Sequence, residues 1–329
     1  MRILIVGAGA VGGYFGARLT QSGRDVTFLV RPGRAERLKA DGLKIISPKG
    51  NVTIVPRLAI TGAVSSSYDI VVLAVKAYAL DQATIDFAPA VGSNTMIVPF
   101  LNGMRHLDLL TAQFGSERVL GGVCLVATSL KDDGSIEQMS DTQSLSYGEI
   151  PGGVTQRVEQ LDRVLAGAGF EGRLSRDILR EMWEKWIFLA ALGGITCLFR
   201  GTVGEIEAVT GGAELARQLL TECSAVAMAS GHAPTSDSIA RIQAAVTAKG
   251  SDATSSMYRD LRAGKPVEAD HIIGDLLTRA RKLSVPAPLL VTALVHLAVY
   301  QNRLRAHLSR DANQSDSEGG RLTGFQANP

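Results

Sequence analysis

The chain has 329 residues, of which 46% are hydrophobic and 20% charged, and its formal net charge is +2. This length favours two domains with packed cores, and the near-neutral charge gives no reason to expect a general binder of nucleic acid or of membrane surfaces. The three cysteines, Cys124, Cys197 and Cys223, lie far apart and form no CxxC pair. We therefore expect neither a disulfide framework nor a zinc site, and a reducing, cytoplasmic compartment fits best.

Neither a signal peptide nor a membrane-spanning segment is expected. Glycines interrupt the apolar start of the chain from Gly7 onward, whereas a signal peptide needs a continuous apolar core. The longest apolar run, Trp186 to Phe199, is shorter than the roughly 20 residues that span a bilayer. This run is interpreted as a buried helix.

The chain opens with an apolar run, Arg2 to Val6, followed by a glycine motif and a helix-like stretch. This strand–turn–helix order is the fingerprint of a dinucleotide-binding domain. Gly7 permits the tight turn, Gly9 lets the backbone approach a pyrophosphate, and Gly12 lets the helix pack on the strand. The alternative is a glycine-rich turn with no ligand. The predicted cofactor-binding residues of this loop are Gly7, Gly9, Ala10, Val11 and Gly12.

The second predicted strand, Asp25 to Val30, is followed by a cation. An NAD-binding protein usually carries Asp or Glu there to accept hydrogen bonds from the ribose hydroxyls, whereas this chain has Arg31. A cation suits a 2′-phosphate, and Arg34 and Arg37 follow nearby and could assist. The sequence therefore predicts NADP rather than NAD, with a solvated arginine at the strand end as the alternative.

Further apolar runs continue the predicted sheet. Because the carboxyl ends of parallel strands face the ligand crevice of an open α/β sheet, Lys76 and Asn102 are predicted to lie near the cofactor or substrate. A last pair of strands, expected to be antiparallel, closes this domain near residue 150. The runs are Tyr68–Ala77, Thr95–Met104 and Arg118–Leu130, and then the pair Ser135–Ser140 and Gln143–Ile150.

From about Ser175 helical periodicity replaces the strand-like runs. A long helix up to Phe199 is expected, with Ser175 as its cap. Lys185 lies between Trp183 and Trp186. Desolvation by these neighbours would lower the pKa of the lysine toward the range useful for proton transfer. The alternative is a lysine whose ammonium reaches solvent, and periodicity leaves both open.

The motifs, taken in order, resemble the ketopantoate reductase family (2-dehydropantoate 2-reductases) over residues 1–305. They are GAGAVGGYFGARL, FLVRPGR, VVLAVKAY, PFLNGM, WEKW and SSMYRDLRAGKPVEADHIIGDL. The resemblance implies an α/β fold: an N-terminal Rossmann dinucleotide-binding domain, residues 1–174, and a C-terminal all-helical domain, residues 175–309, similar to that of 6-phosphogluconate dehydrogenase. The polar composition of residues 310–329 predicts a disordered tail.

Individual residues match the functional positions of that family. Lys185 matches the catalytic lysine, which favours the functional interpretation of this residue. Glu268 matches the glutamate that helps to hold the lysine and the substrate hydroxyl, and Ser256 matches a serine that binds the substrate carboxylate. The remaining predicted contacts are Arg31 for the 2′-phosphate, Lys76 for the cofactor, and Asn102 for both cofactor and substrate.

Two positions depart from the family pattern. Ketopantoate reductases usually carry asparagines four and eight residues after the catalytic lysine, where this chain has Leu189 and Gly193. We therefore expect a pocket that is more apolar, and roomier near Gly193 and Gly194. The resemblance does not fix the substrate or a role in pantothenate biosynthesis.

The implied activity is NADPH-dependent reduction of a 2-oxo acid to a 2-hydroxy acid. One alternative is a non-catalytic NADPH-binding sensor on the same scaffold, and another is a reductase of a bulkier ketoacid. The expected partner is a small molecule, not nucleic acid or a membrane, and the oligomeric state stays open with a homodimer as one alternative. No metal is expected, because His232, His271 and His296 form no cluster with ligand spacing.

Overall fold

The computed structural model describes the backbone of residues 1–319 and the side chains of residues 1–307. The chain forms two compact units, unit 1 (Met1–Trp186) and unit 2 (from Ile187 onward). The sequence placed the domain boundary between residues 174 and 175. The units divide later, inside helix α6 (Ile178–Phe199), because the first turns of this helix pack on a sheet of unit 1.

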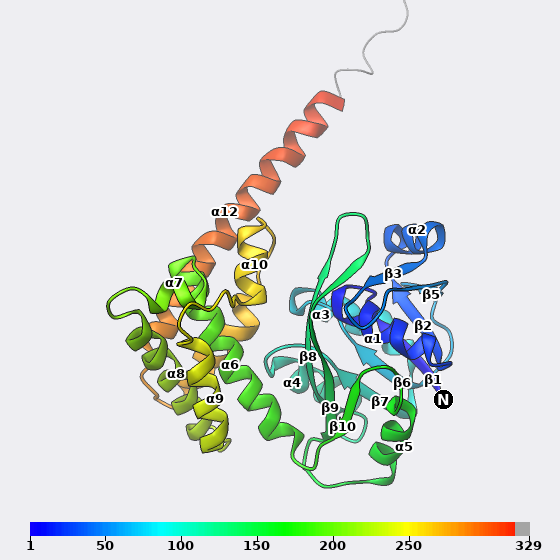
Figure 1. The fold of residues 1–329 in the computed structure, drawn as a ribbon. Helices are drawn as coiled ribbons and strands as arrows, with labels where there is room; N and C mark the ends of the chain where they lie inside the picture. Colours follow the sequence, from blue (N-terminus) through cyan, green and yellow to red (C-terminus); the bar gives the residue numbers. More distant parts are fainter. Residues whose placement is uncertain (320–329) are drawn as a thin grey trace, which may run out of the picture. The chain divides into compact units, whose positions relative to one another are not determined.

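Unit 1 contains a five-stranded sheet with the order β5-β2-β1-β6-β7, and all of its pairs are parallel (Figure 1). The central strand, β1, is buried from Ile3 to Val6, as an apolar run in the middle of a parallel sheet should be. The strands are β1 (Arg2–Val6), β2 (Asp25–Val30), β5 (Arg57–Ile60), β6 (Tyr68–Leu73) and β7 (Val91–Pro99). The helical segments between and after them are α1 (Ala10–Gln21), α2 (Pro32–Asp41), η1 (Ala77–Ala79), α3 (Leu80–Phe87), η2 (Ala88–Ala90) and α4 (Arg105–Phe114).

A second sheet in unit 1 is built on a long antiparallel hairpin of β8 (Leu120–Leu130) and β9 (Ile136–Glu149) (Figure 1). The prediction of two separate strands within residues 135–150 was wrong. One strand covers both runs, because β8 continues to pair with it beyond an irregularity between Val126 and Thr128. The other strands of this sheet are β3 (Leu43–Ile46), β4 (Val52–Ile54) and β10 (Glu171–Leu174).

The start of α6 lies against this second sheet at a pair of glycines. Gly121 of β8 and Gly148 of β9 are register partners. A Cβ at Gly121 would lie 2.7 Å from Cγ2 of Ile178, and a Cβ at Gly148 would lie 2.4 Å from the carbonyl oxygen of Ser175. Both distances are shorter than a non-bonded contact allows. The glycine pair therefore lets Ile178 at the start of α6, and Ser175 in the connection before it, approach the sheet so closely.

A buried ion pair closes the end of β9. The Glu149 side chain is 4% exposed, and Arg157 on α5 (Gln156–Leu165) donates through Nε to Oε1 at 2.8 Å and through Nη2 to Oε2. The hydroxyl of Thr155 donates to the same carboxylate. The hydrogen bonds from Arg157 hold the pKa of Glu149 below its usual value, against the opposing effect of burial.

We expect Glu149→Gln to lose about 1–3 kcal/mol of unfolding free energy at pH 7, because a buried charged hydrogen-bond partner is removed. A carboxyl whose pKa is depressed by folding stabilises above its unfolded pKa of about 4.3, and this contribution disappears as the pH falls through the folded pKa. The difference between parent and variant should therefore shrink in acid. Urea unfolding at neutral pH and near pH 4 tests this. Glu137→Gln, which breaks an exposed pair with Lys131, is the control and should change little.

The regular secondary structure in the described part of unit 2 is all helical, with loops between the helices. Buried apolar side chains from several helices form its core, among them Leu219, Cys223, Leu276 and Leu297. After α6 the elements are α7 (Val203–Glu207), α8 (Gly212–Ala229), α9 (Ser236–Val246), α10 (Ser256–Arg262), the π-helical η3 (Asp270–Gly274), α11 (Asp275–Lys282) and α12 (Pro288–Gly319).

The end of the chain differs in part from the predicted disordered tail, residues 310–329. The last helix, α12, continues to Gly319, so residues 310–319 are helical. Extending an existing helix costs less free energy than starting one. Polar residues can therefore be helical when they continue a helix that is already formed. Residues 320–329 lie outside the described residues.

Helix α6 is long and apolar enough, by length and composition, to cross a membrane, and the described residues contain one such helix. Of its most apolar stretch, 67% is buried inside the protein. Core helices of soluble proteins meet the same criteria, so we interpret α6 as a core helix.

Candidate functional site

The segments that follow four neighbouring strands lie at one edge of the parallel sheet. Val6 is the register partner of both Leu29 and Leu73, and Leu73 is the partner of Pro99, so these strand ends are level. This edge is where ligands bind in open α/β sheets. The predicted residues that follow these strand ends are the glycine loop, Arg31, Lys76 and Asn102.

The glycine loop divides into positions that the fold needs and one that it does not. Gly7 has a φ of +97°, and a Cβ at Gly12 would lie 2.2 Å from the Gly7 carbonyl oxygen. A Cβ at Gly9 would meet no protein atom within 4 Å, although Gly9 is the N-cap of α1. The first turn of α1 has no acidic residue and no side-chain cap. An open, uncapped helix start of this kind fits a pyrophosphate.

Two arginines of the predicted cofactor region differ in their surroundings. The Arg31 side chain is exposed, and its residue caps α2 with extended backbone. Arg34 instead contacts the glycine loop, since its Nε donates to the Ala8 carbonyl at 3.2 Å and its Nη2 to the Gly134 carbonyl at 3.1 Å. Sequence reasoning gave Arg34 only an assisting role. Its spacing of three residues from Arg31 on one helix was the available signal.

Lys76 and Asn102 lie after the adjacent strands β6 and β7. Lys76 is exposed and caps the short helix η1. Asn102 is half-buried and precedes Gly103, whose φ of +77° turns the chain into α4. Both side chains are thus carried by turns at the same sheet edge as the glycine loop, where contacts to a bound dinucleotide are made.

Lys185 belongs to unit 1, although the sequence placed it in the helical domain. Its Nζ donates to the Cys124 carbonyl on β8 at 2.8 Å, and the side chain is half-buried. Burial raises the pKa of the Cys124 thiol to about 11, against the opposing charge of Lys185, so the thiol is protonated at neutral pH. The neighbouring rings of Trp183 and Trp186 are buried, 4.9 Å apart. This lysine is therefore anchored on the sheet rather than simply extended into water.

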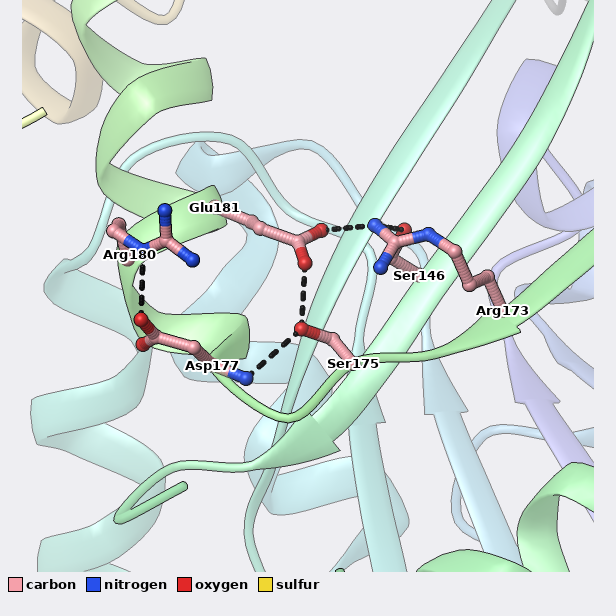
Figure 2. Close-up of polar contacts among 6 residues, drawn as sticks. All are labelled: Ser146, Arg173, Ser175, Asp177, Arg180 and Glu181. Carbon is pink, nitrogen blue, oxygen red and sulfur yellow. Dashed lines mark hydrogen bonds and ion pairs between the residues drawn. The ribbon is translucent and has the colours of Figure 1, made fainter. Parts of the chain in front are cut away.

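One turn before the lysine, Glu181 joins α6 to the strands beneath it (Figure 2). The Ser175 hydroxyl donates to Oε1 of Glu181 at 2.6 Å, and Arg173 on β10 pairs with the other carboxylate oxygen. The prediction of Ser175 as the helix cap was wrong, because α6 begins at Ile178. Ser175 instead accepts from the Asp177 backbone N–H at 3.1 Å and orders the connection into the helix.

Unit 2 carries Ser256 and Glu268. Ser256 is the first residue of α10, directly after the cap Ser255, which accepts from the Tyr258 N–H at 2.9 Å and lies 2.8 Å from the Thr196 hydroxyl. Glu268 is buried just before the π-helical η3, and its carbonyl accepts from the N–H of Ile272. Single π turns are frequent beside functional residues. The structure thus leaves Ser256 half-buried and Glu268 buried.

The expected roominess near Gly193 is corrected by the structure. A Cβ at Gly193 would lie 2.7 Å from Cε of Met257, and one at Gly194 would lie 2.5 Å from Cδ2 of Leu219. Met257 and Leu219 are both buried. The volume that a longer side chain would take on α6 is therefore filled by apolar groups from α10 and α8.

Two models of known protein families match the chain. Residues 3–152 match the family described as "Ketopantoate reductase PanE/ApbA", and residues 177–301 match "Ketopantoate reductase PanE/ApbA C terminal". The chain belongs to the ketopantoate reductase family. "Uncharacterized oxidoreductase YkpB" of Bacillus subtilis is 39% identical over 302 residues, covering 92% of this chain and 99% of that protein. A 2-dehydropantoate 2-reductase of Mesorhizobium japonicum is 30% identical over 319 residues, covering 90% and 97%.

The predicted fold of this reductase is confirmed by solved structures. A ternary structure of D-mandelate dehydrogenase with NADH and anilino(oxo)acetate superposes with a TM-score of 0.84 over 93% of this chain and 100% of that one, at 20% identity. At this identity the match shows the fold alone. The family match and the named relatives identify the protein as an oxidoreductase acting on CH–OH groups.

Proposed function

We propose that this protein is a cytoplasmic reductase that uses NADPH to convert a 2-oxo acid to the 2-hydroxy acid. The observation that carries the proposal is the ammonium of Lys185, held on β8 within the same compact unit as the open glycine loop. A proton donor and a dinucleotide-binding edge are the two parts that carbonyl reduction requires.

Lys185 is proposed as the general acid. The reduced nicotinamide supplies the hydride when bound. As the carbonyl carbon accepts that hydride, the electron pair of the C=O π bond moves to oxygen, and Lys185 donates a proton there to give the hydroxyl. The neutral amine is then reprotonated from solvent. A fixed ammonium stabilises the developing negative charge without reorganising during the step.

The other polar residues keep the roles that family membership supports. Glu268 is proposed to orient the lysine and the new hydroxyl, and Ser256, with Asn102, to bind the substrate carboxylate. Lys76 and the glycine loop are proposed to contact the cofactor. A homodimer remains a prediction.

The cofactor preference should depend on Arg31. We expect Arg31→Ala to weaken NADPH binding by about tenfold to a hundredfold and to leave NADH binding nearly unchanged, because one charge-assisted phosphate contact contributes roughly 1.5–3 kcal/mol. Fluorescence titration of both cofactors measures this. The control is Arg57→Ala, an exposed arginine at the start of β5. An unchanged preference in Arg31→Ala, or tighter binding of NADH by the parent, would contradict the assignment.

The substrate is proposed to be a 2-oxo acid other than ketopantoate, and ketopantoate is proposed to be reduced poorly or not at all. Leu189 and Gly193 provide no amide, and the Met257 methyl lies against Gly193, so a hydroxyl placed there would lose its hydrogen bonds. Steady-state NADPH oxidation across straight, branched and aromatic 2-oxo acids tests the function. A kcat/KM for ketopantoate of about 10⁴ M⁻¹s⁻¹ or more would refute this specificity. No turnover with any acid would refute the proposed activity.

A further inference from the structure

We propose that Glu181 is a positioning residue for Lys185: it clamps the first turns of α6 onto the second sheet of unit 1 and so sets where the lysine ammonium lies. The effect of this clamp on catalysis rests on the proposed role of Lys185 as general acid. The placement itself can be measured whether or not that role is right.

Glu181 and Lys185 are four residues apart on one helix, so they share a face. Each makes a bond that leaves the helix and ends on unit 1. Glu181 is bound by the Ser175 hydroxyl and by Arg173, and Lys185 donates to the Cys124 carbonyl at 2.8 Å. The two residues therefore attach successive turns of α6 to the rest of unit 1.

These attachments lie on or next to one row of register partners that crosses three strands of the second sheet. Arg173 on β10 is the register partner of Ser146 on β9, and Ser146 is the partner of Val123 on β8. Arg173 Nη2 also donates to the Ser146 hydroxyl at 2.7 Å (Figure 2). Cys124, which accepts from Lys185, is the next residue after Val123. Glu181 and Lys185 thus hold α6 to opposite ends of the same short stretch of sheet.

The buried part of the clamp is the one that should determine its strength. Arg173 is 54% exposed, and exposed ion pairs contribute little because solvent screens them. Ser175 is 2% exposed, and its 2.6 Å hydrogen bond to the carboxylate is charge-assisted. In Glu181→Gln the buried Ser175 hydroxyl is left with an uncharged and therefore poorer acceptor. Glu181 and Ser175 are therefore the residues to change.

The same helix provides a matched control. Arg180 on α6 pairs with Asp177, the residue just before the helix, at 2.7 Å, and about half of each side chain is exposed (Figure 2). Arg180→Gln removes one ion pair from the same turn without releasing the helix from the strands. A change seen in Glu181 variants and absent in Arg180→Gln therefore reports the clamp rather than the loss of a charge.

The first experiment measures placement without catalysis. The full-length parent, Glu181→Gln, Ser175→Ala and Arg180→Gln are labelled with trace acetic anhydride, and peptide mass spectrometry gives the acetylation rate of Lys185 relative to exposed Lys131. We expect this rate to change by at least about threefold in the Glu181 and Ser175 variants and to stay at the parent value in Arg180→Gln. Rates equal to that of Arg180→Gln would overturn the proposal. Circular dichroism checks folding, and Ser175→Ala tests the clamp if Glu181→Gln unfolds.

The second experiment links placement to turnover. A displacement of about 1 Å can cost about a hundredfold in rate, so we expect kcat to fall by about tenfold or more in Glu181→Gln, with the NADPH Kd within about twofold of the parent. The alkaline limb of its kcat–pH profile should also shift. If the parent turns over none of the acids, the proposed function fails, and if Lys185→Ala keeps full turnover, the role of Lys185 as general acid fails; in both cases the labelling result stands. If Lys185→Ala is inactive but Glu181→Gln matches Arg180→Gln in labelling and kcat, the clamp alone is refuted.

Discussion

Replacing Lys185 with alanine is expected to lower turnover by at least about two orders of magnitude while NADPH affinity changes only a few-fold. General acid catalysis contributes roughly 10²- to 10⁴-fold, and a fixed ammonium adds electrostatic stabilisation of the developing alkoxide. The lysine is bound to the Cys124 carbonyl on β8, whereas the glycine loop follows β1, so the phosphates should be held as before.

Single-turnover NADPH oxidation with the best acid of the panel, beside a fluorescence titration of NADPH, measures both quantities. Lys185→Met keeps apolar bulk at the position and separates loss of the proton donor from loss of packing. Lys131→Ala, which removes a surface lysine of the β8–β9 hairpin, serves as the control. Turnover within about tenfold of the parent in both Lys185 variants would show that the lysine is structural and that the proposed mechanism is wrong.

Gly9→Ala should separate folding from cofactor binding. A methyl group at this position meets no protein atom within 4 Å, and the backbone is extended, with φ −85° and ψ −163°. The fold should therefore lose only about 1 kcal/mol, the usual cost of alanine at an N-cap. The same methyl group points into space that we assign to the pyrophosphate, so affinity for both NADPH and NADH should fall by at least about tenfold, or 1.4 kcal/mol.

Thermal unfolding and cofactor titration of Gly9→Ala are compared with two other variants. Gly33→Ala, on α2, also meets no atom within 4 Å and should change neither quantity by much. Gly12→Ala places its Cβ 2.2 Å from the Gly7 carbonyl oxygen and should lose stability and binding together. Parent-like affinity in Gly9→Ala would mean that no phosphate approaches this turn.

The parallel sheet was largely predictable because most of its strands can be recognised from the local sequence. β1 and β2 are mostly apolar runs with clear ends, and the glycine loop has a spacing that few other structures require. The short strands β3, β4, β5 and β10 were missed. β3 and β10 pair with β9, and β5 pairs with β2, across separations that no local pattern records. β4 pairs with the nearby β3 but has only three residues, too few for a clear pattern.

The identities of the candidate site residues were predictable, but their contacts with surrounding residues were less so. The resemblance gave Lys185, but its acceptor is the main-chain carbonyl of Cys124, and the sequence holds no trace of a carbonyl contact. Glu181 could have been found from its spacing to the lysine. Gly193 was expected to leave space, and only packing shows that Met257 takes it, because tertiary neighbours decide whether a missing side chain leaves a void.

The glycine pair under α6 implies different evolutionary freedom at its two positions. A methyl group at Gly121 meets the side chain of Ile178, which a smaller residue there could relieve. At Gly148 the methyl group meets the main-chain oxygen of Ser175, which exists whatever residue occupies that position. Among relatives that keep this helix seated on the sheet, position 121 should therefore covary with position 178, while position 148 should remain glycine.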